Sequence, residues 1–261
     1  MTESGVVQER VRPFSNTVTG GWKGRLARVV RLLGDLQLLT IERDLRAVMP
    51  SWRGDVLDVG CGSSPFKHLL NPDVTNYTGV DIADADGKFS YKNSFSVPFD
   101  GVSLPFEDNS FDCILCTEVL EHVYEVRSLV GEIYRVMRPG ASILITVPWS
   151  ARWHYIPFDY FRYTPSALNL ILKDFADIQV FARGNELCVL ANKAVVLQLS
   201  MLRGSWYLVA ATALLLPITA VVCGVLVVGA HLSLFLGRGN SADPLGFTVI
   251  AKKANEPELS N

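Results

Sequence analysis

Glycines that follow a short apolar run mark the first place where this chain could bind a ligand. Residues 56–66 read VLDVGCGSSPF, in which a predicted strand leads into a Gly-x-Gly turn at Gly60 and Gly62. Such glycines let the backbone turn sharply and leave room for a ligand against the peptide planes. In an open α/β sheet this turn lies at the carboxyl end of its strand, where ligands bind.

An acidic residue in the next strand adds to this pattern. Asp81 ends the predicted strand TGVDI, at the spacing of one βαβ step after the turn. A carboxylate there can accept two hydrogen bonds from a ribose diol, which favours a nucleoside ligand, although an aspartate that only ends its strand is the alternative. Ser63, Ser64 and Pro65 stand where a dinucleotide fingerprint has its third glycine, so a nicotinamide-dependent oxidoreductase is the weaker hypothesis.

Polar side chains at residues 153–165 could meet an acceptor. His154 is a candidate general base for a hydroxyl group, because an imidazole titrates in the useful pH range, and His122 is an equally ambiguous second candidate. Asp159 and Arg162 are expected instead to hold this loop by hydrogen bonds. No metal site is expected: Cys113 and Cys116 form one C-x-x-C pair, but on a strand their side chains point to opposite faces.

Alternating β-branched runs and helical stretches between residues 54 and 182 must position these groups. This alternation predicts a mostly parallel, doubly wound α/β sheet. A further strand is predicted within residues 243–253, on the alternation from Phe247 to Ile250. The other predicted strands are 55–59, 77–82, 111–116, 142–147 and 178–182, and the predicted helices are 65–70, 125–137 and 165–173.

Five motifs, in this order, resemble those of class I S-adenosylmethionine-dependent methyltransferases, in particular the type 11-like methyltransferase domain. They are VLDVGCG (56–62), GVDI (79–82), LPFEDNSFD (104–112), TEVLEHV (117–123) and EIYRVMRPGASILITVP (132–148). The resemblance covers about residues 54–175. It implies an α/β fold with a Rossmann-like, seven-stranded, mostly parallel sheet that an antiparallel strand closes.

The resemblance also implies S-adenosylmethionine as the cofactor and roles for particular residues. Asp81, with Ile82 beside it, is implied to hold the ribose, and Asp100 to meet the adenine amino group. Cys116 and Thr117 are implied to lie near the sulfonium and the acceptor. The residues implied to line the methionine end are Asp58, Gly60, Cys61 and Gly62.

A run without charged residues extends from Gly204 to Gly237 and is longer than one membrane crossing requires. Pro217 near its middle favours an apolar helical hairpin over one straight helix. A hairpin buried in an oligomer core is the alternative. The resemblance implies that the last predicted strand returns to the sheet, which would place both ends of the insertion on one side of the membrane. The basic flanks favour the cytoplasmic side.

An amphipathic helix is predicted near the N-terminus. Trp22, Leu26, Val29, Leu33 and Leu36 recur at helical spacing, and Lys23, Arg25, Arg28 and Arg31 share the other face. This helix could lie on an anionic membrane or pack its apolar face on the main domain.

These patterns divide the chain into a polar tail and basic helix (1–50), a methyltransferase core (51–190), a membrane-associated insertion (191–240), and a closing strand with a polar tail (241–261).

Composition narrows the choice of partners. The 261 residues hold 24 Lys and Arg against 26 Asp and Glu, which argues against a nucleic-acid-binding protein. Five scattered cysteines favour a reducing compartment. We expect a membrane-associated methyltransferase on the cytoplasmic face, with membrane lipids as partners and a small-molecule or lipid-linked acceptor. A catalytically silent, membrane-tethered module that binds a nucleoside is the alternative.

Overall fold

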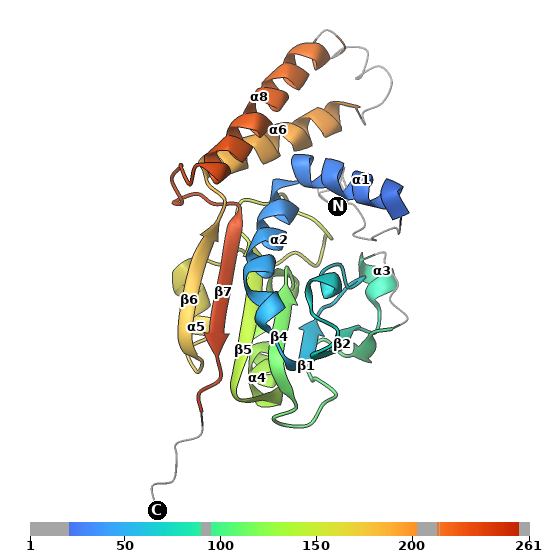
Figure 1. The fold of residues 1–261 in the computed structure, drawn as a ribbon, viewed down its shortest axis with the longest axis vertical. Coiled ribbons are helices and arrows are strands. Elements are labelled where there is room, and N and C mark those ends of the chain that lie inside the picture. Colours follow the sequence, from blue (N-terminus) through green and yellow to red (C-terminus); the bar gives the residue numbers. More distant parts are fainter. Residues whose placement is uncertain (1–20, 90–94, 203–212, 214, 256–261) are drawn as a thin grey trace, which may run out of the picture.

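The computed structural model describes residues 21–89, 95–202, 213 and 215–255, and its strands form one sheet (Figure 1). The strand order is β3-β2-β1-β4-β5-β7-β6. All pairs are parallel except those of β7, which runs antiparallel to both β5 and β6. This confirms the predicted seven-stranded Rossmann-like sheet with its closing antiparallel strand. The strands are β1 (Gly54–Val59), β2 (Thr75–Ile82), β3 (Val97–Phe99), β4 (Phe111–Thr117), β5 (Met137–Pro148), β6 (Ala176–Arg183) and β7 (Gly246–Lys252).

Two apolar layers cover the faces of the sheet. Successive residues of β4 point to opposite faces, so Cys113 and Leu115 join one core cluster while Ile114 and Cys116 join the other. This confirms that the C-x-x-C cysteines diverge. The helices are α1 (Gly21–Gly34), α2 (Leu36–Val48), α3 (Ala85–Phe89), α4 (Val126–Val136), α5 (Pro165–Ile171), α6 (Glu186–Leu202) and α8 (Leu216–Phe235), and short 3₁₀ helices span Met49–Ser51, Lys67–Leu69 and Leu120–His122.

The prediction of an α-helix at residues 65–70 is wrong. The chain there forms turns and the 3₁₀ helix Lys67–Leu69, closed by short-range hydrogen bonds such as that from the Leu69 amide to the Phe66 carbonyl. Leu70 already has extended backbone angles, and Pro72 follows shortly after it. A proline and the extended segment before it leave no room for a full α-helical turn.

The N-terminal amphipathic segment is divided into two helices. Asp35 separates them, and its side chain caps α2 by accepting a hydrogen bond from the Leu38 amide at 3.0 Å. Trp22 and Leu26 on α1 are 68% and 55% exposed, so the apolar side of α1 does not pack on the main domain as one alternative supposed. The polar side faces inward, where Arg28 pairs with Glu42 at 2.7 Å. The predicted polar tail (1–20) and the side chains of Lys23 and Arg25 lie outside the described residues.

The apolar insertion between β6 and β7 is built from α6 and α8, which pack against each other and project from one end of the sheet (Figure 1). Among the described residues, one helix, Leu216–Phe235, is long and apolar enough to cross a membrane. Asn185, just before α6, joins the two ends of the insertion: its side-chain amide donates to the Ser233 hydroxyl at 3.0 Å and to the Arg238 carbonyl at 2.9 Å. Both ends of the insertion therefore return to the same edge of the domain.

Candidate active site

A cavity of about 780 Å³ opens at the carboxyl ends of β1, β2 and β4, under the N-terminal helices. Among the predicted cofactor residues, Gly60, Cys61, Gly62, Asp81, Ile82, Asp100 and Thr117 line it, as do both candidate histidines, His122 and His154. Asp58 and Cys116 are not among its lining residues. The sheet thus brings together nearly all residues singled out from the sequence, as expected for the carboxyl edge of a parallel sheet.

The glycine turn and Asp81 form one hydrogen-bonded unit. The Asp81 carboxylate accepts from the Gly62 amide at 2.7 Å through Oδ2 and from the Ile82 amide at 2.8 Å through Oδ1. Gly60 and Gly62 both have positive φ angles, of 66° and 52°. A side chain at Gly60 would overlap the Val119 side chain, so the turn requires glycine there on both counts.

Asp58 lies beneath the turn and is buried. The Tyr77 hydroxyl donates to its Oδ2 atom at 2.7 Å. Burial raises the pKa of Asp58 to about 7, the Tyr77 hydrogen bond opposes this rise, and the nearby charge of Asp81 adds to it. This geometry makes Asp58 a support of the turn rather than part of the cavity wall. Cys116 is likewise fully buried in the core behind Thr117.

Asp100 lies at another part of the cavity wall, just after β3. Its Oδ1 atom accepts hydrogen bonds from the Ser103 and Val102 amides, at 2.7 and 2.8 Å. These bonds hold the pKa of the Asp100 carboxyl below its ordinary value, so the group is ionised at neutral pH. Asp100 is exposed at the cavity wall, where its carboxylate can also accept a hydrogen bond from a ligand.

The loop after β5 is held as predicted by Asp159 and Arg162. The two side chains form a bidentate pair, at 2.6 and 2.9 Å, and Asp159 also accepts from the His154 amide at 3.0 Å. Although burial opposes it, the hydrogen bonds from Arg162 and His154 keep the pKa of Asp159 far below its ordinary value. The carboxylate therefore stays charged and fixes the backbone on which His154 stands.

His154 and His122 meet at the cavity, with ring centroids 4.9 Å apart. His122 Nδ1 lies 2.6 Å from the Phe158 carbonyl oxygen. Burial, with the charge of His154 as the next cause, lowers the pKa of His122 to about 4. His122 is therefore neutral at physiological pH and can act as a base or as a metal ligand.

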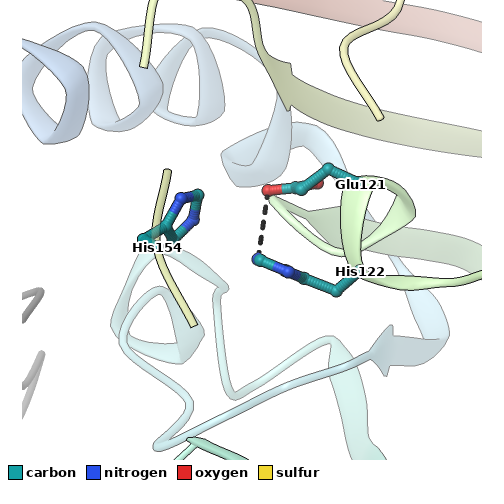
Figure 2. Close-up of side chains that lie close together, drawn as sticks. All are labelled: Glu121, His122 and His154. Carbon is teal, nitrogen blue, oxygen red and sulfur yellow. Dashed lines mark ion pairs between the residues drawn. The ribbon is translucent and has the colours of Figure 1, made fainter. Parts of the chain in front are cut away.

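Two glutamates beside these histidines were not singled out from the sequence, although both lie in the TEVLEHV motif. Glu121 is fully buried next to His122 (Figure 2), and burial, together with the charge of Glu118, raises its pKa well above the ordinary value. Glu118 has an unusual positive φ of 52° and accepts a 2.8 Å hydrogen bond from the buried Arg183. A strained residue at a cavity wall is typical of functional sites.

The N-terminal helices supply a wall that sequence reasoning also missed. Arg31, Asp35, Gln37, Leu38 and Ile41 line the cavity from α1 and α2. Their spacing looked like that of an ordinary amphipathic helix. The sequence of this segment does not indicate which of its residues line a cavity whose other walls come from later parts of the chain.

Comparisons with known proteins agree with this geometry. Residues 57–145 match a family model described as a methyltransferase domain. The ubiquinone biosynthesis O-methyltransferase of Hahella chejuensis is 30% identical over 114 residues, which are 40% of this chain and 46% of that protein. The sterol 24-C-methyltransferase of Schizosaccharomyces pombe is 33% identical over 100 residues, 33% of this chain and 25% of that protein. The chain thus spans less than half the length of these relatives.

Solved structures show the same fold. A S-adenosylmethionine-dependent methyltransferase from Archaeoglobus fulgidus superposes with a TM-score of 0.50 at 22% identity, covering 88% of this chain and 99% of the other. One from Thermotoga maritima has a TM-score of 0.52 at 12% identity, covering 88% and 95%. The matched motifs and this sheet together confirm that the core of the chain is a class I methyltransferase domain, whose cofactor is S-adenosylmethionine.

Proposed function

We propose that this chain transfers a methyl group from S-adenosylmethionine to a lipid-linked or membrane-embedded acceptor at the cytoplasmic face of a membrane. The observation that carries the proposal is the position of three helices with exposed apolar side chains, α1, α6 and α8. They lie at the end of the molecule toward which β1 and β4 point (Figure 1), and the cavity opens at the carboxyl ends of these strands. The cofactor, when bound, supplies an activated methyl group, so the protein has mainly to align donor and acceptor.

The first motif and the second strand fit the cofactor. Gly60 and Gly62 line the cavity with backbone alone, a side chain at Gly60 would overlap Val119, and Asp81 lines the cavity beside them. In this proposal the turn accommodates the methionine end, Asp81 accepts from the ribose hydroxyls and Asp100 accepts from the adenine amino group. This assignment leaves Asp58 and Cys116 as supports behind the wall.

The other half of the cavity is then left for the acceptor. His122 and His154 lie there with Tyr155, Phe158 and Tyr160. An imidazole at this place could take the proton that an acceptor hydroxyl or amine loses when it is methylated. The aromatic side chains would exclude water and contact an apolar acceptor.

Three helices present apolar side chains to solvent at this end of the molecule. On α1 the exposed side is opposite to Arg28, whose pairing with Glu42 turns the polar side inward. Such a surface suits the boundary of a lipid bilayer, because in water its apolar side chains would remain exposed to solvent. The exposed residues are Trp22, Leu26, Val29, Val30 and Leu33 on α1, Leu187, Leu190, Leu197 and Leu202 on α6, and Ile218, Val221, Val222, Val225, Val228, Leu232 and Phe235 on α8.

Two further observations support a lipid acceptor on one side of the membrane. The tie from Asn185 to Ser233 and Arg238 returns both ends of the hairpin to the domain, as a re-entrant or double-crossing anchor requires. Two relatives are named for a sterol and for ubiquinone, and both names refer to lipids. A membrane anchor raises the effective concentration of such an acceptor without any new contact.

The test of this function uses the detergent-solubilised full chain and cofactor labelled in its methyl group. Membranes and soluble extract are incubated separately, and Asp81→Ala serves as the control with weakened cofactor binding. We expect label in lipid-extractable products from the membranes. Label found only in small water-soluble products would contradict the lipid acceptor, and cofactor binding without any transfer would favour the silent module.

A second experiment tests the membrane surface by itself. The paired substitution Val225→Asp and Val228→Asp should reduce co-sedimentation with phosphatidylcholine vesicles, because it places charge on the exposed side of α8. Val74→Asp is the matched control, since Val74 is also exposed but precedes β2 at the opposite end of the sheet. Equal loss in both variants, or no loss in either, would contradict the assignment of this surface.

A further inference from the structure

Three potential metal ligands converge on the acceptor half of the cavity. Glu121 and His122 come from the 3₁₀ helix Leu120–His122, and His154 comes from the loop after β5 (Figure 2). One ligand atom from each lies within 4.8 Å of the other two. His154 is far from Glu121 and His122 in the sequence, so the sheet edge and the loop held by Asp159 bring it to them.

Glu121 gives the strongest reason to look for a cation. Its side chain is fully buried, and neither carboxylate oxygen has a hydrogen-bond partner in the described part of the chain. The nearest basic atom is His122 Nε2, which lies 3.6 Å from Oε1, beyond hydrogen-bond distance. A buried carboxylate without partners is costly, and a bound cation would supply the missing partner.

The histidines are oriented as metal ligands are. His122 Nδ1 lies 2.6 Å from the Phe158 carbonyl oxygen, and His154 Nδ1 lies 3.1 Å from the Arg152 carbonyl oxygen and 3.3 Å from Asp159 Oδ2. Because a carbonyl oxygen only accepts, Nδ1 is the protonated atom in each neutral ring. The lone pair of each ring is then on Nε2, and an outer N–H bonded to a carbonyl or carboxylate is the usual support of a metal-bound histidine.

We propose that Glu121, His122 and His154 bind one divalent transition-metal cation, of the class of Zn²⁺, Mn²⁺ or Co²⁺. Two imidazoles and one carboxylate suit these ions better than Mg²⁺ or Ca²⁺, which prefer oxygen ligands. Metal–ligand bonds of about 2.0 to 2.2 Å require the donors to close by about an ångström. Three protein ligands leave coordination positions for water or for a donor atom of the acceptor.

This assignment goes beyond the proposed methyl transfer and replaces the expectation that the chain has no metal site. That expectation rested on Cys113 and Cys116, which lie elsewhere. It also gives His154 a different role from that of a free general base, because its Nε2 lone pair would be used by the cation. The proposed site can be tested by cation binding alone, in the absence of cofactor and acceptor.

The experiment titrates the metal-free full chain, freed of any polyhistidine tag, with Co²⁺ and with Zn²⁺. Calorimetry measures affinity and stoichiometry, and the visible absorption of Co²⁺ reports its coordination. We expect one equivalent to bind, with the affinity reduced more than about tenfold by Glu121→Gln and by His154→Gln, and about 10- to 100-fold by Asp159→Asn, which removes an outer partner. His68→Gln is the matched control, because His68 is a histidine outside the cluster, bonded to Arg28 and Pro65.

Two results would overturn the site. One is a wild-type titration that shows no binding, and the other is binding that His68→Gln weakens as much as the cluster variants do. Circular dichroism and cofactor affinity, measured on each variant, identify any that has failed to fold; Glu121→Gln keeps the shape of the side chain for this reason. Loss of cation binding with intact cofactor binding separates this proposal from the methyltransferase assignment.

Discussion

In the function we propose, the cavity has a cofactor half around Asp81 and an acceptor half around His154, and these two halves are built in different ways. In the cofactor half, Asp81 and the turn at Gly62 are joined through backbone amides at the ends of adjacent parallel strands. In the acceptor half, His122 and His154 come from separate segments, and their surroundings depend on side-chain pairs such as Asp159 with Arg162. One half is therefore fixed by the sheet itself, and the other by long-range side-chain contacts.

This difference separates what is common to a fold from what can vary. Strand ends and backbone amides serve many related proteins in the same way, whereas loops and side-chain networks can change without altering the sheet. We expect substitutions in the acceptor half to change turnover and local stability, and substitutions in the cofactor half to change cofactor affinity.

The largest expected effect comes from Arg183, which is fully buried and holds Glu118 at the cavity wall. Arg183→Met should lower the free energy of unfolding by about 3 to 5 kcal/mol, because it leaves Glu118 without its buried partner. Urea unfolding of the two proteins measures this. Arg43→Met, on an exposed arginine, is the control and should change it by no more than about 0.5 kcal/mol. Equal changes in the free energy of unfolding for the two variants would show that the pairing of Arg183 with Glu118 does not stabilise the fold.

His154→Ala should lower turnover about 100-fold, because it removes either a proton acceptor or a metal ligand. The affinity for the cofactor should change by less than about twofold, since His154 lies in the other half of the cavity. Steady-state kinetics and calorimetry give the two quantities, with His68→Ala as the control. A parallel loss of cofactor affinity would mean that the two halves are not separate.

Asp81→Ala should weaken cofactor binding by about 1.5 to 3 kcal/mol, the range for hydrogen bonds to a charged group. The substitution also frees the Gly62 and Ile82 amides, so the turn loses its own support. Calorimetry with S-adenosylmethionine measures the change, and Asp73→Ala, outside the cavity wall, should bind like the wild type. Unchanged affinity in Asp81→Ala would refute the ribose assignment.

The smallest effect concerns Tyr77 and depends on pH. The folded pKa of Asp58, about 7, is above its ordinary value of 3.8, so the stability that this group contributes is full below 3.8 and is lost as the pH rises from there through 7. The Tyr77 hydroxyl reduces this loss by donating to the charged carboxylate. Tyr77→Phe should therefore cost about 1 kcal/mol more at pH 8.5 than at pH 5, measured by urea unfolding. A pH-independent cost would mean that Asp58 does not titrate in this range.

The cofactor half could be predicted from the sequence because its signals are local. The turn at Gly60 and Gly62 requires positive φ angles, and Asp81 ends the adjacent strand, so residue type and spacing together predicted their position. The short strand β3 escaped prediction, since three residues carry too little pattern.

The acceptor half could be predicted only in part. Each histidine was identified as a candidate, but nothing in the spacing of His122 and His154 indicated that their rings meet. The burial of Glu121 is a tertiary property, and so is the inward turn of Arg28 that leaves the apolar side of α1 exposed. Amphipathic spacing shows that a helix has two sides, but not which side the rest of the molecule covers.

The place of the apolar hairpin in the strand order has a consequence for how the chain folds. Strand β7 lies between β5 and β6, and β6 makes its ladder with β7 alone among the described strands. During synthesis, α6 and α8 emerge before β7, so the ladder that holds β6 forms only after the hairpin has left the ribosome. If the hairpin enters the bilayer as it emerges, β6 and β7 join the sheet at the membrane surface.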